Sequence, residues 1–209
     1  MCIRDRLGTA LLWFGWFGFN AGSALAANDQ AVNAFIVTNT SAAAGALMMM
    51  ILSMRSTGKP SAIMTATGAV AGLVAITPAS GFVGPLAAII IGAGVGLVSW
   101  FAIEFKNSRG WDDSLDVWAV HGMGGVWGAI ATGLFASAAI GGTDGVFMGG
   151  SISVLTTQII AIVVTAVYAI AVTIALLKIL DVTLGLRVSS SDEEAGMDKS
   201  VHAEEAYLS

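Results

Sequence analysis

The sequence predicts an all-α membrane protein, built as a polytopic bundle of transmembrane helices. Of its 209 residues, 56% are hydrophobic and only 11% are charged. The mean hydropathy of +0.82 is far above that of ordinary soluble domains. Eight of the nine Lys and Arg residues lie outside the long apolar runs, and only Lys178 lies within one. Together these observations favour a chain that crosses a bilayer several times.

Six apolar runs are each long enough to cross a bilayer, which takes about 20 residues in a helix. In chain order they are Leu7–Ala27, Ala31–Met54, Ser61–Ser80, Gly81–Phe105, Val117–Ala139 and Gly149–Leu180. The last run is long enough to require tilt or an extension beyond the lipid. We therefore expect six transmembrane spans.

The basic residues predict the orientation of these spans. They occur before the first run, in alternate connections and at or after the end of the sixth run: Arg4, Arg6, Arg55, Lys59, Lys106, Arg109, Lys178, Arg187 and Lys199. The other connections, around residues 28–30, 77–85 and 140–146, contain no Lys or Arg. Because positive loops stay inside, both ends of this chain are expected to be cytoplasmic.

The two ends of the chain differ from the apolar region between them. Residues 1–6, MCIRDR, stop abruptly at Leu7 and are interpreted as an assembly or cloning scar, although a natural cytoplasmic lead is an alternative. Residues 7–188 form the predicted membrane domain, and residues 189–209 form an acidic tail that supplies much of the net charge of −5. No basic patch suggests nucleic acid as a partner. Cys2 is the sole cysteine, which excludes an intrachain disulfide.

His121 is the strongest candidate for a functional residue. It is the only histidine in the chargeless run Val117–Ala139 and is surrounded by glycines. A titratable group at hydrocarbon depth usually faces a cavity, a partner or a substrate path. The alternative is a packing histidine that is hydrogen-bonded to a neighbouring helix.

Aromatic and polar residues share a short stretch of the first span. Phe19 and Ser23 are four residues apart, and Trp16 precedes Phe19 by three, so a helix places all three on one face. An aromatic surface attracts a small cation while a hydroxyl accepts its hydrogen bond. The alternative is an aromatic belt at the level of the lipid headgroups.

Two further patterns predict local structure. Asp112, Asp113 and Asp116 precede the fifth span, where carboxylates suit the positive end of a helix dipole, so we expect them to cap it. Small residues in spans three and four, among them Gly68 and Gly72, permit close helix packing.

Several motifs resemble the ammonium transporter (Amt/Mep/Rh) family. GWFGFNAGSA is similar to the sixth helix of that family, DVWAVHGMGG to its tenth, and GLRV with the following residues to its cytoplasmic tail. The stretch GAVAGLVAITPASGFVGP is similar as well, so the resemblance extends from about Leu7 to Tyr207. One departure lies in the tail, where the family has His-Gly-Glu and this chain has His202-Ala203-Glu204, which puts the local turn in doubt.

The resemblance implies a role for individual residues. Phe19 matches a phenylalanine gate, Ser23 matches the hydroxyl of an external recruitment site that Trp16 would help to line, and His121 matches the second histidine of a twin-histidine pore. It also implies a transport protein for ammonium or ammonia rather than an enzyme, with no cofactor and no metal. A homotrimer in the cell membrane is expected, with a PII-class regulatory protein as a possible partner at the tail.

The chain departs from the family in length. The family has eleven spans, made of two inverted five-helix repeats and a final helix, and this chain resembles only the second repeat and that helix. Inverted-repeat carriers place their pathway between the repeats, so we expect a fragment that does not form a sealed conduit alone. A sensor of the same family, or an inactive truncated half-transporter, remains open as an alternative.

Overall fold

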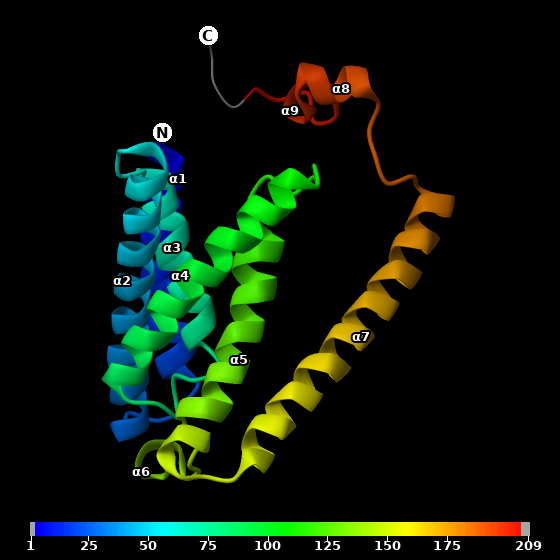
Figure 1. Cartoon of the computed structure of the whole chain (residues 1–209). Coiled ribbons are helices and arrows are strands. Elements are labelled where there is room, and N and C mark those ends of the chain that lie inside the picture. The colour runs from blue at the N-terminus through cyan, green and yellow to red at the C-terminus, as the bar shows by residue number, and fades with distance from the viewer. Residues whose placement is uncertain (1–2, 206–209) are drawn as a thin grey trace. The chain divides into compact units, whose positions relative to one another are not determined.

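The computed structural model describes residues 3–205, and those residues form helices connected by turns (Figure 1). Cys2 and Tyr207, on which part of the sequence analysis rests, lie outside the described residues. The elements are α1 (Ile3–Gly22), α2 (Asp29–Thr57), α3 (Ala62–Ile76), α4 (Pro85–Ser108), the π-helix η1 (Trp118–Met123), α5 (Gly124–Phe135), α6 (Ala138–Gly141), the 3₁₀-helix η2 (Val146–Met148), α7 (Ile152–Thr183), α8 (Ser190–Ala195) and α9 (Met197–Ser200). This confirms the predicted all-helical membrane bundle.

The six apolar runs correspond to α1, α2, α3, α4, the continuous η1–α5 helix and α7. By length and composition, α2, α4 and α7 are each sufficient to cross a membrane, whereas α3 is apolar but shorter. The third helix is shorter than the predicted run because Pro78 follows it and cannot continue a helix. The fourth helix likewise begins later than predicted, at Pro85, where proline suits the first helical turn.

The chain forms two compact units, one ending at Ile162 and one beginning at Val163, so α7 belongs to both. The first unit holds a buried core in which side chains of α2, α3, α4 and α5 pack together, including Val37, Ile76, Ile91 and Ala131. In the second unit, the later part of α7 is followed by the short helices α8 and α9. No residue of α7 is buried.

The helices of the first unit approach closely at Ser41 of α2. A Cβ atom added to Gly72 of α3 or to Gly92 of α4 would overlap the carbonyl oxygen of Ser41. The Ser41 hydroxyl also donates a 2.9 Å hydrogen bond to the carbonyl of Gly72. Small residues therefore let three helices meet at backbone distance, as the glycine spacing predicted.

The acidic tail is partly helical rather than irregular. Ser189 caps α8 by accepting a hydrogen bond from the backbone N–H of Asp192 at 3.2 Å. Lys199 pairs with Glu205 at 2.6 Å. Ala203 has a φ of +54°, so the chain makes a left-handed turn here with a residue other than the glycine that this conformation favours.

Candidate functional site

His121 lies within η1, the π-helical turn at the start of the helix that continues as α5. Its side chain is exposed and has no hydrogen-bond or ion-pair partner among residues 3–205. Single π turns inside longer helices occur frequently at functional sites. The sequence located this histidine, but nothing in its spacing indicated the π turn.

Asp113 caps the helix that carries His121. One carboxylate oxygen accepts the backbone N–H of Val117 and the other accepts that of Trp118, both at 2.9 Å. These hydrogen bonds, with that from Trp118 contributing most, and the nearby charge of Lys106 lower the pKa of the Asp113 carboxyl below its usual value, although desolvation opposes them.

Asp116 binds a lysine instead of capping the helix with its carboxylate. Lys106, near the end of α4, is only 5% exposed. Its Nζ donates 2.6 Å hydrogen bonds to the Asp116 carboxylate and to the carbonyl of Asp113. Asp116 also has a φ of +55°, an uncommon conformation for a residue other than glycine. Asp112 is exposed beside this network.

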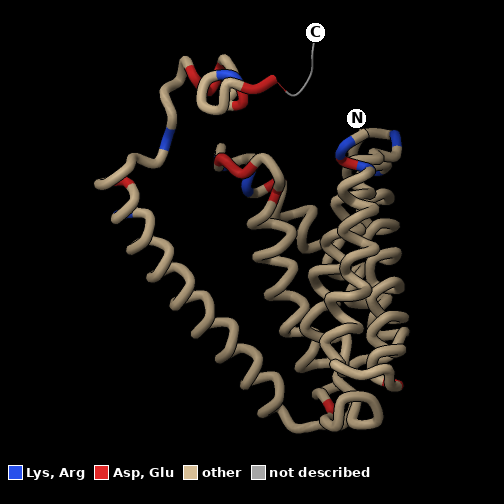
Figure 2. Tube along the Cα trace, turned by 180° about the vertical axis from the view of Figure 1, so that it is seen from behind, with Lys and Arg blue, Asp and Glu red and all other residues tan. Residues whose placement is uncertain are grey.

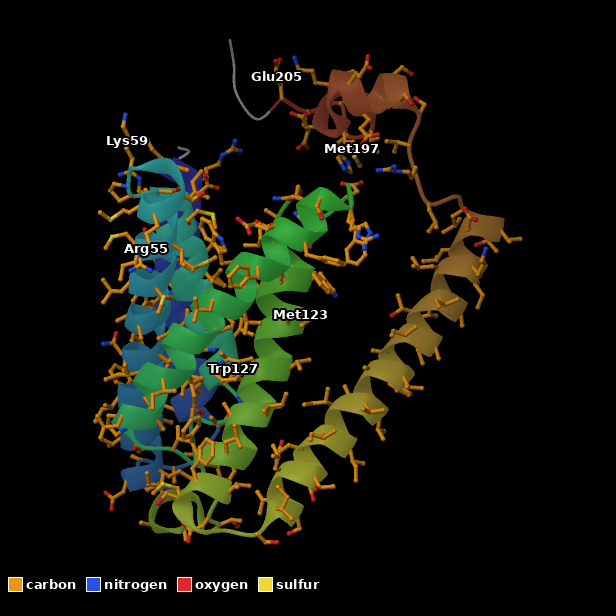
Figure 3. All side chains as sticks on the ribbon, in the orientation of Figure 1. Arg55, Lys59, Met123, Trp127, Met197 and Glu205 are labelled. Atoms are coloured by element: carbon orange, nitrogen blue, oxygen red, sulfur yellow. The ribbon has the colours of Figure 1, made fainter. Side chains whose placement is uncertain are left out.

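The network is local to one end of the helices. Figure 2 shows that the Lys and Arg residues of the first unit gather at the end where α1 begins, while the middle of the helices is free of charge among the described residues. Arg55 and Lys59 mark this end of α2 in Figure 3. The burial of Lys106 was not predicted, because the sequence suggested only that this lysine lies in a basic connection.

The aromatic residues of α1 face different surroundings. Phe19 is 61% exposed, and its ring lies edge-on to that of Trp16, with 5.9 Å between the centroids. Trp16 is partly buried against the core, and its indole N–H donates a 2.8 Å hydrogen bond to the Thr77 hydroxyl. The Ser23 hydroxyl, just beyond α1, donates to the Phe19 carbonyl at 2.7 Å.

A cavity of about 230 Å³, lined by both polar and apolar residues, adjoins the end of α1. Its lining comes from α1, α2 and the turn after α3: Asn20, Ser23, Ala24, Gln30, Ala34, Thr77, Ser80, Gly81 and Phe82. The structure therefore brings Ser23 to a cavity that is lined by neither Phe19 nor Trp16, although helical spacing predicted that the three side chains share one face. The reason is that Ser23 follows the end of α1 at Gly22, so regular helical spacing does not extend to it.

Asn20 is a polar residue of this region that the sequence analysis did not single out. It is 5% exposed and donates a 2.9 Å hydrogen bond to the Thr38 hydroxyl, linking α1 to α2. Its amide within an apolar span was a usable signal, because buried polar groups require partners.

The comparison with protein families identifies the group to which this sequence belongs. Residues 5–207 match the model described as the ammonium transporter family. The chain belongs to that family. It is 49% identical over 201 residues to ammonium transporter Amt1 of Archaeoglobus fulgidus, covering 96% of this chain and 51% of the relative. It is 48% identical over 208 residues to an ammonium transporter of Bacillus subtilis, covering 98% of this chain and 51% of the relative.

Solved structures of the family share the fold. Saccharomyces cerevisiae Mep2 matches with a TM-score of 0.83 and 34% identity, over 88% of this chain and 43% of Mep2. A sensor Amt protein matches with a TM-score of 0.84 and 31% identity, over 94% of this chain and 48% of that protein. The chain thus spans about half the length of its relatives in the family.

Proposed function

We propose that this chain forms about half of a membrane pathway that conducts ammonium-derived nitrogen. The observation that carries the proposal is His121, an exposed imidazole without a partner among the described residues, placed in a chargeless, glycine-rich run. The curated relatives named above are ammonium transporters, which supports ammonium or ammonia as the substrate.

The chemistry of the imidazole suits this substrate. An ammonium ion that enters hydrocarbon loses its hydration, whereas neutral ammonia requires far less solvation. A neutral imidazole can both donate and accept a hydrogen bond, so His121 can hold ammonia in line or exchange a proton with it. Potassium cannot lose a proton, which gives such a path a means of selection.

We propose that Phe19 gates the outer end of this path and that Ser23 offers a hydroxyl to the arriving cation. The exposed ring of Phe19 and the place of Ser23 at the cavity beside the end of α1 support these roles. The Trp16 ring lies in a T-shaped arrangement with that of Phe19, and the hydrogen bond from Trp16 to Thr77 ties α1 to the end of α3. Asp112, Asp113 and Asp116 are proposed as structural residues at the other end.

The remaining parts of the proposal concern the whole assembly. The large exposed apolar residues of α1, such as Leu11 and Phe14, suit a surface that the first inverted repeat or lipid covers. The gathering of basic residues at the end where α1 begins supports a cytoplasmic location for that end. By family resemblance we also propose a homotrimer and a PII-class regulator that binds the tail.

The test is growth of a bacterial strain that lacks its own ammonium transporters, on limiting ammonium, after expression of the complete reading frame that contains this chain. Growth is expected with the native residue and a severe loss with His121→Ala, at unchanged protein level in the membrane. His202→Ala is the matched control and is expected to keep growth. Growth that is equal for the native protein and His121→Ala would overturn the role of His121.

A further inference from the structure

The burial pattern around η1 shows that the π turn changes the direction of His121. In α5, Gly124 packs on Val95 and Val74, and Gly128 packs on the Ala75 carbonyl. His121 precedes these glycines by three and seven residues, so a uniform α-helix would place it on the same packed stripe. Ala119, five residues before Gly124, would point away from that stripe.

The structure has the opposite arrangement. Ala119 is fully buried and Val120 is 3% exposed, whereas the His121 side chain is exposed. A π turn takes up one additional residue, which rotates the preceding residues by about 100°, the step of one residue in an α-helix. The extra residue therefore moves Ala119 into the packed stripe and His121 out of it, while Val120 stays beside the stripe in either geometry.

Helix α4 contacts the backbone of this turn at two levels. Ser99 is fully buried, and its hydroxyl donates to the carbonyl of Ala119 at 3.3 Å. Lys106 lies seven residues further along α4, on the same face, and holds Asp113 and Asp116 immediately before the turn. Between these contacts, Ala102 and Ile103 pack in the same core cluster as Ala119.

We propose that Ser99 is a positioning residue that maintains the π turn and thereby keeps His121 facing out of the packed stripe. A donor from a neighbouring helix satisfies a carbonyl of the turn outside the regular helical hydrogen-bond pattern. Removal of that donor favours the uniform α-helix, in which His121 turns toward α3 and α4. The importance of this orientation for conduction rests on the function proposed above, but the orientation itself is measurable without transport.

The test measures the rate at which diethyl pyrocarbonate modifies His121 in the whole chain in lipid nanodiscs, with peptides quantified by mass spectrometry. The sequence contains two histidines, so exposed His202 serves as an internal reference. Ser99→Ala is expected to lower the ratio of His121 to His202 modification by about three- to tenfold, the population change that corresponds to the net contribution of one hydrogen bond.

Matched variants distinguish the effect of losing the Ser99 hydroxyl from the effect of changing side-chain packing at this position. Ser99→Thr restores a hydroxyl and is expected to keep the native ratio, whereas the equally branched Ser99→Val is expected to lower it. Ser53→Ala removes another buried serine, one that binds Met50 and Ser61 away from η1, and is expected to change nothing. An unchanged ratio in Ser99→Ala, or equal ratios in the folded Thr and Val variants, would overturn the proposal. If the Thr and Val variants do not fold, the proposal is decided by comparing the labelling ratio of Ser99→Ala with that of Ser53→Ala.

Because the labelling needs no flux, a protein that fails to conduct ammonium can still support or refute the role of Ser99. Conversely, a native labelling ratio in Ser99→Ala together with normal ammonium-dependent growth would remove this inference and leave the proposed function intact.

Discussion

Asp113 illustrates how one side chain organises the start of the helix that carries His121. Its two carboxylate oxygens each accept a backbone N–H that has no partner within the helix itself. The ionised carboxylate is therefore favoured in the folded protein, and its pKa is lowered. Asp113, five positions before the first residue of the π turn, thus couples its protonation to the stability of the helix that carries His121.

Replacement of Asp113 by Ala is expected to destabilise the folded chain by about 1 kcal/mol, the usual contribution of a helix cap. The folded-state pKa lies below the unfolded value of about 3.9. The contribution is therefore complete above that pH and declines as the pH falls through the lower, folded-state pKa. Unfolding in mixed detergent micelles is followed by circular dichroism. The difference in the free energy of unfolding between the variant and the native chain is expected to be constant near neutral pH and to shrink below about pH 4. A difference that grows on acidification would contradict this account.

At Phe19, the exposed ring has one aromatic neighbour, Trp16, whose indole N–H is held by Thr77. Phe19→Ala in the complete protein is expected to increase the leak of hydrated sodium ions severalfold, because removal of the ring widens the outer end of the path. Phe14→Ala on the same helix, where the ring is 78% exposed, serves as the control and is expected to leave the leak unchanged. Sodium flux into proteoliposomes measures both; a native leak in Phe19→Ala would argue against a gate.

At the scale of helices, the first unit is organised by close approach at small residues. Gly45 of α2 and Gly68 of α3 each lack room for a Cβ, because it would overlap the carbonyl oxygen of the other. Gly94 has a different partner, because a Cβ added to it would overlap the ring of Trp127 on α5, which is labelled in Figure 3. The Trp127 N–H also donates to the Ile91 carbonyl at 2.9 Å. Alternate glycines of α4 therefore serve two different helix contacts.

Gly72→Ala is expected to destabilise the bundle by about 1–3 kcal/mol, because the new methyl group overlaps the Ser41 carbonyl and the helices must separate. Gly15→Ala on α1 is the matched control, since a Cβ there meets no atom within 4 Å. The control is expected to be neutral or stabilising, as Ala is the better helix former. Unfolding midpoints in mixed micelles compare the two; equal midpoints for both variants would contradict the steric explanation.

For the whole molecule, length and exposed surface indicate what is needed for conduction. The chain covers about half of each curated relative. The face of α1 that carries Leu11, at 62% exposure, and Phe14 is apolar and uncovered by the described residues. In inverted-repeat transporters the path lies between the two repeats. Under the function proposed above, this chain supplies one wall of that path.

We expect the isolated chain in liposomes to show no ammonium-dependent flux above that of empty liposomes, because its single wall leaves the path open to lipid. Reconstitution with the other half of the Bacillus subtilis relative is expected to restore flux. The same mixture made with His121→Ala is the control for a flux that passes His121. Stopped-flow fluorescence of a pH dye inside the liposomes measures the flux in all three preparations. Selective flux through the chain alone would contradict the half-pathway interpretation.

Local patterns in the sequence were sufficient to predict the helical spans, the position of His121 within one of them, and the close packing at Gly68 and Gly72. Run length, charge placement and helical spacing are properties of neighbouring residues, so they can be read without knowledge of the fold. The capping position of Asp113 was also predictable, because acidic residues before an apolar run are typical of a helix start.

The tertiary structure decided where the side chains point and which distant groups they bind. The Trp16 indole bonds Thr77, 61 residues away in the sequence, and Lys106 is buried by residues of the following connection. The π turn reverses the facing that uniform helical spacing would give to Ala119 and His121. Helical periodicity assumes a constant rotation per residue, whereas contacts with α4, at Ser99 and Lys106, accompany a local change in that rotation. The sequence alone therefore singled out His121 as the candidate residue, and packing between helices determined the direction in which its side chain faces.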